Sequence, residues 1–143
     1  MAGFEVGTDG PDRILVAVDG SDTSLRAAAY AVGLARRQGA SVRAVYVSTL
    51  PASAAWVGAD VDPGQEVAEE LGGLITNGLA STGVAGSFVH RRGDPYTEIV
   101  RAADDMRAEA IVVGASTKAS HRVVGSLAGR LVKHAKWPVI VVP

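Results

Sequence analysis

The stretch "RILVAVDGSDTSLRAAAYAVGLARRQG", residues 13–39, contains one strand and one helix joined by a short polar turn. Residues 13–19 form an apolar run rich in β-branched residues, which predicts a strand buried on both faces. Apolar residues then recur at helical spacing, at Leu25, Ala28, Ala29, Val32 and Ala35. Ser21 or Asp22 can cap this helix and Gly39 can end it. The stretch therefore predicts a buried strand followed by a helix that packs back onto it.

The rest of the chain repeats this alternation. Strands are expected at residues 41–48, 86–92, 108–114 and 137–142, and helices at 65–82, 96–107 and 126–135. Asp94 is the expected cap of the third helix, and Pro95 lies in its first turn, where a missing N–H costs least. Alternating strands and helices predict a parallel sheet with helices on both faces and right-handed crossovers. The fold class is thus α/β: residues 13–143 form a single doubly wound domain with a five-stranded parallel sheet, and residues 1–12 form a flexible tail.

Composition argues against several classes of protein. The formal net charge is −1, so no general attraction to nucleic acid or to an anionic membrane is expected. Cysteine is absent, which removes disulfides, thiol nucleophiles and cysteine-based zinc sites. The three histidines are widely spaced, and no metal site is predicted. No apolar run is long enough to span a bilayer, and the first residues do not resemble a signal peptide, so we expect a cytoplasmic protein.

The topology also predicts where a ligand binds. In doubly wound sheets the ligand lies beyond the carboxyl ends of the strands, at the point where the strand order reverses. If the order is 3-2-1-4-5, that crevice lies between the first and fourth strands, which end at Asp19 and Gly114. A carboxylate at this position can accept hydrogen bonds from ribose hydroxyls or from an amino group. The alternative is that Asp19 only caps the first helix, together with Ser21 and Asp22.

The loop "GASTKASHRVVGS", residues 114–126, is where phosphates would bind. Gly114 lacks a Cβ and permits close approach, and Gly125-Ser126 opens a helix whose free N–H groups favour an anion. Three basic side chains lie between these ends: Lys118, His121 and Arg122. The alternative is a solvated basic loop in which Ser126 serves only as a helix cap.

Three segments together resemble the universal stress protein family. They are "ILVAVDGSDTSLRAAAYAVGLARRQGASVRAVYV", "AIVVGAS" and "VVGSLAGRLVKHAKWPVIVVP", and the similarity covers roughly residues 12–143. The resemblance implies an adenine nucleotide α-hydrolase-like sheet with strand order 3-2-1-4-5. It also implies a homodimer formed through the last strand, in the region Val139 to Val142. A last strand that is short, apolar and at the edge of the sheet is itself expected to offer a pairing surface to a second copy.

Nucleotide-binding members of that family hold ATP between the first and fourth strands. By matching positions, Ala17 and Val18 would line the base, Asp19 would contact the adenosine part and Val47 would pack against it. Phosphates would lie on the loop, and its candidate residues are Gly114, Ser116, Thr117, Lys118, Arg122, Gly125 and Ser126.

The loop departs from the pattern of the ATP-binding members, which is G-x-x-G, a spacer, and then G-S or G-T. Thr117 stands where the second glycine is expected, and seven residues separate it from Gly125, two fewer than in the family pattern. A β-branched threonine does not readily adopt a positive φ. Lys118, His121 and Arg122 could compensate by charge, because cationic donors also hold phosphate.

The sequence therefore predicts a regulatory stress-response protein that is not an enzyme and that binds ATP or a related adenine nucleotide at a remodelled phosphate loop. One alternative is a homodimeric interaction module of the same fold that no longer binds ATP. A second alternative is a weak nucleotide hydrolase, for which Ser126, His121 and Asp19 are the residues that could form a triad. The signalling partner has no signature in the sequence.

Overall fold

The computed structural model describes residues 10–49, 63–116, 126–134 and 136–143. Its elements, in chain order, are β1 (Arg13–Ala17), α1 (Asp22–Gln38), β2 (Ser41–Ser48), α2 (Pro63–Thr82), β3 (Gly86–Arg92), α3 (Pro95–Met106), β4 (Ala110–Gly114), α4 (Ser126–His134) and β5 (Val139–Val142). All neighbouring strands pair in parallel, in the order β3-β2-β1-β4-β5. The predicted fold class and the strand order implied by the resemblance are both confirmed.

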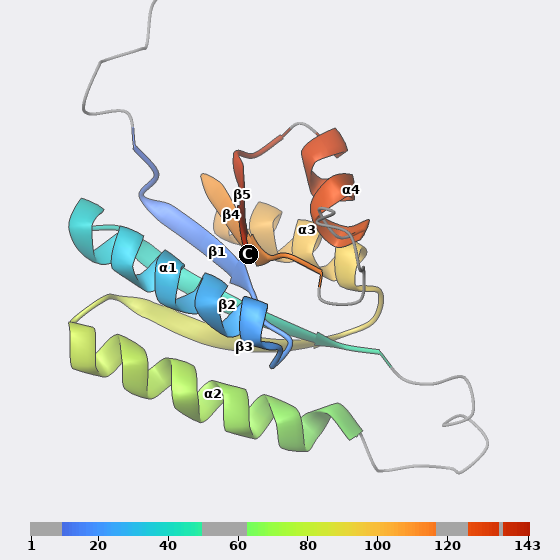
Figure 1. Ribbon diagram of the computed structural model, residues 1–143, viewed down its shortest axis with the longest axis horizontal. Helices are drawn as coiled ribbons and strands as arrows, with labels where there is room; N and C mark the ends of the chain where they lie inside the picture. Colours follow the sequence, from blue (N-terminus) through green and yellow to red (C-terminus); the bar gives the residue numbers. More distant parts are fainter. Residues whose placement is uncertain (1–9, 50–62, 117–125, 135) are drawn as a thin grey trace, which may run out of the picture.

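The sheet lies between two helical layers (Figure 1). Along β1, Ile14 and Val16 pack with α1 and α2 on one face, while Leu15 packs with α3 and α4 on the other. Ile14 and Leu15 are each 0% exposed, so β1 is buried on both sides, as its apolar run predicts. β4, beside it, is buried in the same way, and the two strands form the centre of the core.

The helix caps occur at the residues that the sequence indicates. Ser21 caps α1, and its hydroxyl accepts a hydrogen bond from the N–H of Ser24. Gly39 ends α1 with φ 67°, a conformation that glycine adopts without steric cost. Asp94 caps α3 by accepting from the N–H of Thr97 at 2.9 Å, and Pro95 follows at the first helical position. These caps fix where α1 and α3 begin, next to the carboxyl ends of the strands.

The buried face of α1 differs from the predicted one. Ala29 is exposed, while Ala27 and Ala31 are each 0% exposed. The buried stripe consists of small residues, because α1 lies across several strands and contacts β4, β1, β5 and β2. Leu25 and Val32 are only partly buried and flank this stripe. The face of α1 that packs on the sheet is therefore centred on Ala27 and Ala31, and not on Leu25 and Val32.

Several strands are shorter than predicted. β1 ends at Ala17 instead of residue 19, β4 begins at Ala110 instead of residue 108, and β5 begins at Val139 instead of residue 137. Val18 still donates its N–H to the carbonyl of Val45 at 2.9 Å, so the chain leaves the sheet only at Asp19. Before β5, the carbonyl of Pro138 accepts from the N–H of Ile111. The apolar runs thus extend slightly beyond the regular ladders.

α2 covers β2 and β3 through buried Leu71, Ile75 and Leu79. A Cβ at Gly72 would lie 3.1 Å from the Phe88 ring, so this glycine lets the helix approach β3 closely. Among the helices in the described part of the chain, none is long and apolar enough to cross a membrane.

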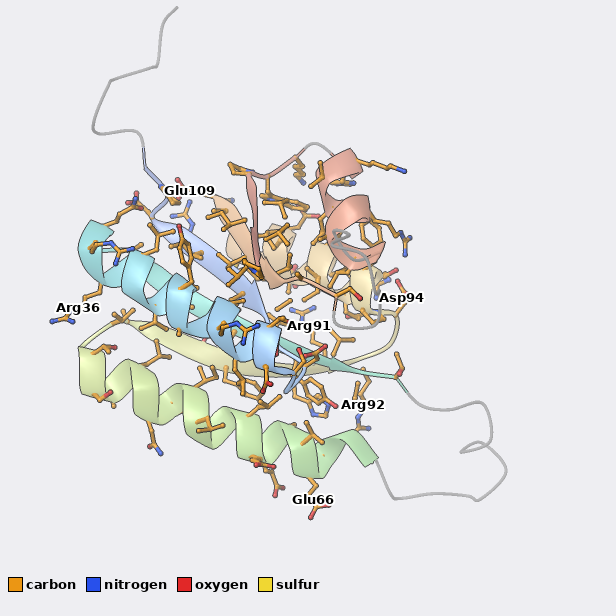
Figure 2. The ribbon with its side chains drawn as sticks, in the orientation of Figure 1. Arg36, Glu66, Arg91, Arg92, Asp94 and Glu109 are labelled. Carbon is orange, nitrogen blue, oxygen red and sulfur yellow. The ribbon has the colours of Figure 1, made fainter. Side chains whose placement is uncertain are left out.

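Charged side chains lie around the outside, and some connect elements. Figure 2 shows Arg36 and Glu66 pointing away from the sheet on the α1 and α2 side. On the other side, Arg91 at the end of β3 pairs with Glu98 of α3 at 3.8 Å and with Asp105 at 2.9 Å. The Arg91 and Glu98 side chains are only 24% and 13% exposed, so this pair helps to hold α3 against the sheet.

Candidate functional site

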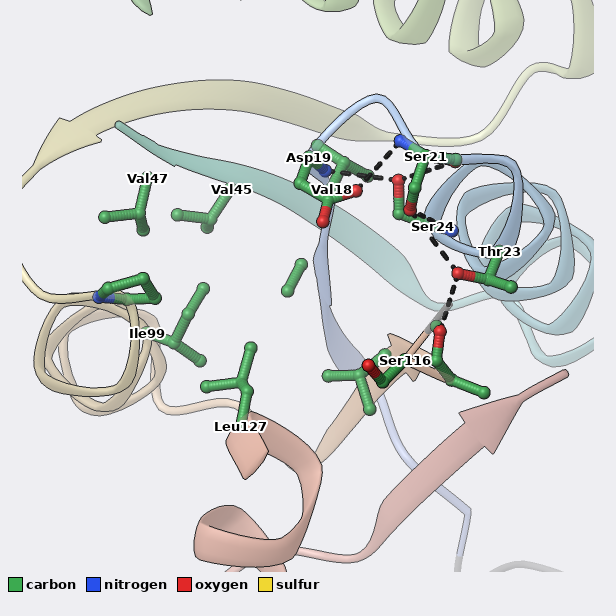
Figure 3. A pocket seen from close by; sticks show the side chains of 15 residues that line it. Val18, Asp19, Ser21, Thr23, Ser24, Val45, Val47, Ile99, Ser116 and Leu127 are labelled. Atoms are coloured by element: carbon green, nitrogen blue, oxygen red, sulfur yellow. Dashed lines mark hydrogen bonds between the residues drawn. The ribbon is translucent and has the colours of Figure 1, made fainter. Parts of the chain in front are cut away.

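A pocket of about 240 Å³ lies at the carboxyl ends of β1 and β4. Its walls come from these strands, from β2, and from the first turns of α1, α3 and α4 (Figure 3). The strand order reverses between β1 and β4, because the chain runs from β1 outward to β3 and then crosses back to β4. The pocket therefore lies in the crevice where the topology predicts a ligand.

One side of the pocket is apolar. Val45 and Val47 point into it from β2, because alternate residues of a strand share a face. Ile99 of α3, which is 1% exposed, packs in the same cluster as these valines, and Leu127 approaches from α4. Pro95, Ala17 and Val113 complete this side. The result is an apolar slot.

The other side is polar and comes from the turn between β1 and α1 (Figure 3). Ser21 donates its N–H to Asp19 Oδ1 at 2.9 Å, and the N–H of Asp19 donates to Ser24 Oγ at 3.1 Å. Ser24 Oγ in turn donates to the carbonyl of Ser21 at 3.0 Å. These bonds fix the turn and place the exposed Asp19 carboxylate at the rim of the pocket. Asp19 therefore contributes to the helix start and also faces the pocket.

The carboxylate of Asp19 is stabilised in its charged form. Burial acts to raise the pKa of Asp19, but interactions with Ser21 and Ser24 outweigh it, and the net pKa lies below the ordinary value of 3.8. Asp19 is thus ionised at neutral pH and acts as a hydrogen-bond acceptor only. It favours a ligand that presents hydroxyl or amino donors, and it repels phosphate.

The lowered pKa predicts a pH-dependent effect of Asp19→Asn on stability. Asn can still accept from the N–H of Ser21, so the substitution removes mainly the charge. We expect the variant to unfold at lower urea at pH 7, by less than about 1 kcal/mol because the group is exposed. The folded-state pKa is depressed, so the difference persists above pH 3.8 and disappears as the pH falls through the folded-state pKa. Urea unfolding followed by circular dichroism across this range measures it, and a pH-independent difference would contradict the assignment.

Gly114 has a structural role in this site. A Cβ built there would lie 2.6 Å from the carbonyl carbon of Thr23 and 2.7 Å from the N of Ser24. The end of β4 therefore touches the backbone of the first turn of α1. Thr23 is 7% exposed. Its hydroxyl bridges the same two segments by donating from Oγ1 to the carbonyl of Ala115 at 2.8 Å.

The structure brings six of the candidate residues together. Ala17, Val18, Asp19, Val47, Gly114 and Ser116 all line the pocket. Four others, Thr117, Lys118, Arg122 and Gly125, lie outside the described residues. Ser126 is the first residue of α4 and is followed by Leu127, which lines the pocket. The structure describes the backbone of Ser126 and not its side chain.

Sequence reasoning missed the wall formed by α3 and part of the polar side. Pro95 was identified only as a helix start and Ile99 only as part of a helix, yet both line the pocket. Val45 could have been found, because it shares a strand face with Val47. Thr23 and Ser24 could have been suspected less directly, because they are polar residues in the first turn of a helix that begins at the crevice.

The pocket combines an apolar slot with an anionic acceptor at its rim. A small apolar ring can pack against the apolar side, and a sugar or an exocyclic amine can donate to Asp19. Within the described ranges, no group of three His, Asp or Glu side chains is placed to hold a metal ion. The chemistry that these residues support is recognition of a small molecule by shape and hydrogen bonds.

Comparison with known proteins gives a consistent result. The model of the universal stress protein family matches residues 11–143. A curated universal stress protein of Methanocaldococcus jannaschii is 33% identical in an alignment 141 residues long, and the match covers 91% of this chain and 81% of the relative.

Two solved structures are also similar. The universal stress protein UspA of Lactobacillus plantarum superposes with a TM-score of 0.79 at 30% identity, covering 92% of this chain and 97% of that chain. A universal stress protein of Archaeoglobus fulgidus in complex with dAMP has a TM-score of 0.68 at 29% identity, with 92% and 97% covered.

Proposed function

This chain belongs to the universal stress protein family, and from that premise we propose that it is a cytoplasmic regulatory protein of the stress response whose pocket binds an adenine nucleotide. Binding would change its conformation or its choice of partner. ATP or a related adenine nucleotide is the proposed ligand.

The observation that carries this proposal is the pocket between β1 and β4, with an apolar slot on one side and ionised Asp19 on the other. Val47 and Ile99 pack together in the apolar lining, against which a base would bind. Asp19 would then accept from ribose hydroxyls or from the adenine amino group. The similarity to a relative whose solved structure is a complex with dAMP supports an adenine nucleotide as the class of ligand.

The phosphates would extend toward the start of α4. Gly114 and Ser116 line the pocket on this side, and α4 begins at Ser126. The first N–H groups of a nine-residue helix carry partial positive charge and favour an anion. Lys118 and Arg122 would add charge to the phosphate end.

A binding role is favoured over hydrolysis by what the polar groups of the pocket already do. The Thr23 hydroxyl donates to Ala115, and the Ser24 hydroxyl donates to Ser21. Neither hydroxyl is next to a histidine among the described residues that line the pocket. These hydroxyls hold the backbone, so we assign them a structural role and propose that the protein is not an enzyme.

We further propose that the protein is a homodimer joined through β5. This strand is at the edge of the sheet, and its sequence, Val139–Val142, contains no charged residue. All four side chains are partly exposed. An apolar edge strand without charges to block pairing readily adds a strand from a second molecule.

Calorimetric titration with adenosine, AMP and ATP tests the ligand assignment, with guanosine as the control. We expect saturable binding of the adenine compounds and at least tenfold weaker binding of guanosine, whose ring presents a carbonyl where adenine presents an amino donor. The absence of heat at millimolar nucleotide would contradict the proposal. It would leave the homodimeric interaction module as the function.

A further inference from the structure

The backbone of Ala115 connects the pocket with the edge strand β5. Its carbonyl accepts from Thr23 Oγ1 at 2.8 Å, and its N–H donates to the carbonyl of Val142 at 2.8 Å. Thr23 and Ala115 both line the pocket, while Val142 is the last residue of β5. The two backbone groups of one residue, Ala115, therefore make hydrogen bonds to the ligand site and to the proposed dimer edge.

A second bond holds the same end of β5. Arg26, one turn after Thr23 in α1, donates from Nε to the carbonyl of Pro143 at 2.9 Å. Val142 and Pro143, which follow one another at the end of β5, are thus hydrogen-bonded to Ala115 and to α1. β5 itself has only four residues and pairs with β4 alone. Short edge strands open more easily than central ones, so these bonds determine how well its end is ordered.

The connection is stiff on the pocket side. The backbone at Gly114 lies so close to Thr23 that a Cβ would be 2.6 Å from the Thr23 carbonyl carbon. Because the two segments touch, the start of α1 and the end of β4 move together. A ligand that contacts either segment would restrict both.

We propose that occupancy of the pocket and pairing of β5 with a second copy of this chain are coupled, with Thr23 as the positioning residue. The inference rests on the proposed ligand and dimer. A ligand that orders Thr23 and Ala115 also orders the end of β5, so a second copy that pairs there pays less ordering entropy. The coupling is reciprocal: dimer formation tightens ligand binding by the same factor that ligand tightens the dimer.

The occupant of the β5 edge is a second copy because the strand is apolar and uncharged. Antiparallel pairing of two identical edges is self-complementary and closes with twofold symmetry. Such pairing requires β5 to be extended up to Val142, whose carbonyl Ala115 holds.

Sedimentation equilibrium with and without saturating AMP tests the coupling in the intact chain. We expect AMP to lower the dimer dissociation constant at least about fivefold. Thr23→Val keeps the shape of the side chain and removes its donated hydrogen bond to Ala115. With AMP raised to saturate each protein, the effect of AMP on the dimer dissociation constant should fall to near onefold in this variant. Thr97→Val is the matched control, because Thr97 lies in the first turn of α3 and its hydroxyl donates to Asp94. It should keep the full effect.

Hydrogen exchange of the Ala115 amide in the wild-type protein provides a readout that needs no variant. Exchange should slow when AMP is added and again when the dimer forms. AMP binding without a change in the dimer constant would overturn the coupling while leaving the ligand proposal intact. A failure of AMP to bind would instead overturn the proposed function, and a protein that stays monomeric would overturn the β5 assignment.

Discussion

Replacing Gly114 by alanine is expected to lower the free energy of unfolding by about 2–3 kcal/mol. The added Cβ would lie 2.6 Å from the carbonyl carbon of Thr23 and 2.7 Å from its oxygen, and these are backbone atoms. A flexible side chain could move aside, but the first turn of α1 cannot move without losing the bond from Thr23 to Ala115. Chemical denaturation at neutral pH measures the loss.

Gly73→Ala is the matched control for this prediction. Gly73 lies on the exposed side of α2, where an added Cβ meets no atom within 4 Å. Alanine has a higher helix propensity than glycine, so this variant should be more stable than the wild type by up to about 1 kcal/mol. If Gly114→Ala also leaves stability unchanged or raises it, then β4 does not approach α1 as closely as described.

The fold could be predicted because its central strands are buried on both faces. β1 and β4 read as short continuous apolar runs, and the segments between strands show helical spacing and recognisable caps. Ser21, Gly39 and Asp94 all end or begin helices where local chemistry indicates. Family membership is also confirmed by the comparisons.

The orientation of α1 could not be predicted, because alanine is compatible with both core and surface. Ala28 is buried and its neighbour Ala29 is exposed, although the two are chemically identical. The bulkier Leu25 and Val32 suggest a face centred on themselves, but close packing of the helix on the sheet selects the small residues.

The pocket was only partly predictable for a different reason. Asp19 and Gly114 follow strands whose ends must meet, so topology places both at the crevice. No feature of the sequence around α3 indicates that the start of this helix lies beside the same crevice, because Ile99 reaches the pocket through tertiary packing alone. The contribution of the residues between Thr117 and Gly125 stays a prediction.

Asp19→Ala is expected to weaken adenine nucleotide binding about 10- to 100-fold, since a hydrogen bond to a charged group is worth about 1.5–3 kcal/mol. The carboxylate is at the rim of the pocket, and its lowered pKa keeps it ionised at neutral pH. Alanine removes the acceptor for the donors of the ligand. Isothermal titration calorimetry with AMP at pH 7 measures the change in affinity.

Asp22→Ala distinguishes a direct contact from a general effect of charge. Asp22 is three residues away, in the first turn of α1, but it does not line the pocket. Both substitutions remove one negative charge near the ligand phosphates, which alone would strengthen binding slightly. We therefore expect Asp22→Ala to bind AMP as well as the wild type or better. Equal weakening in both variants, with their folds intact by circular dichroism, would mean that Asp19 supports the turn and does not contact the ligand.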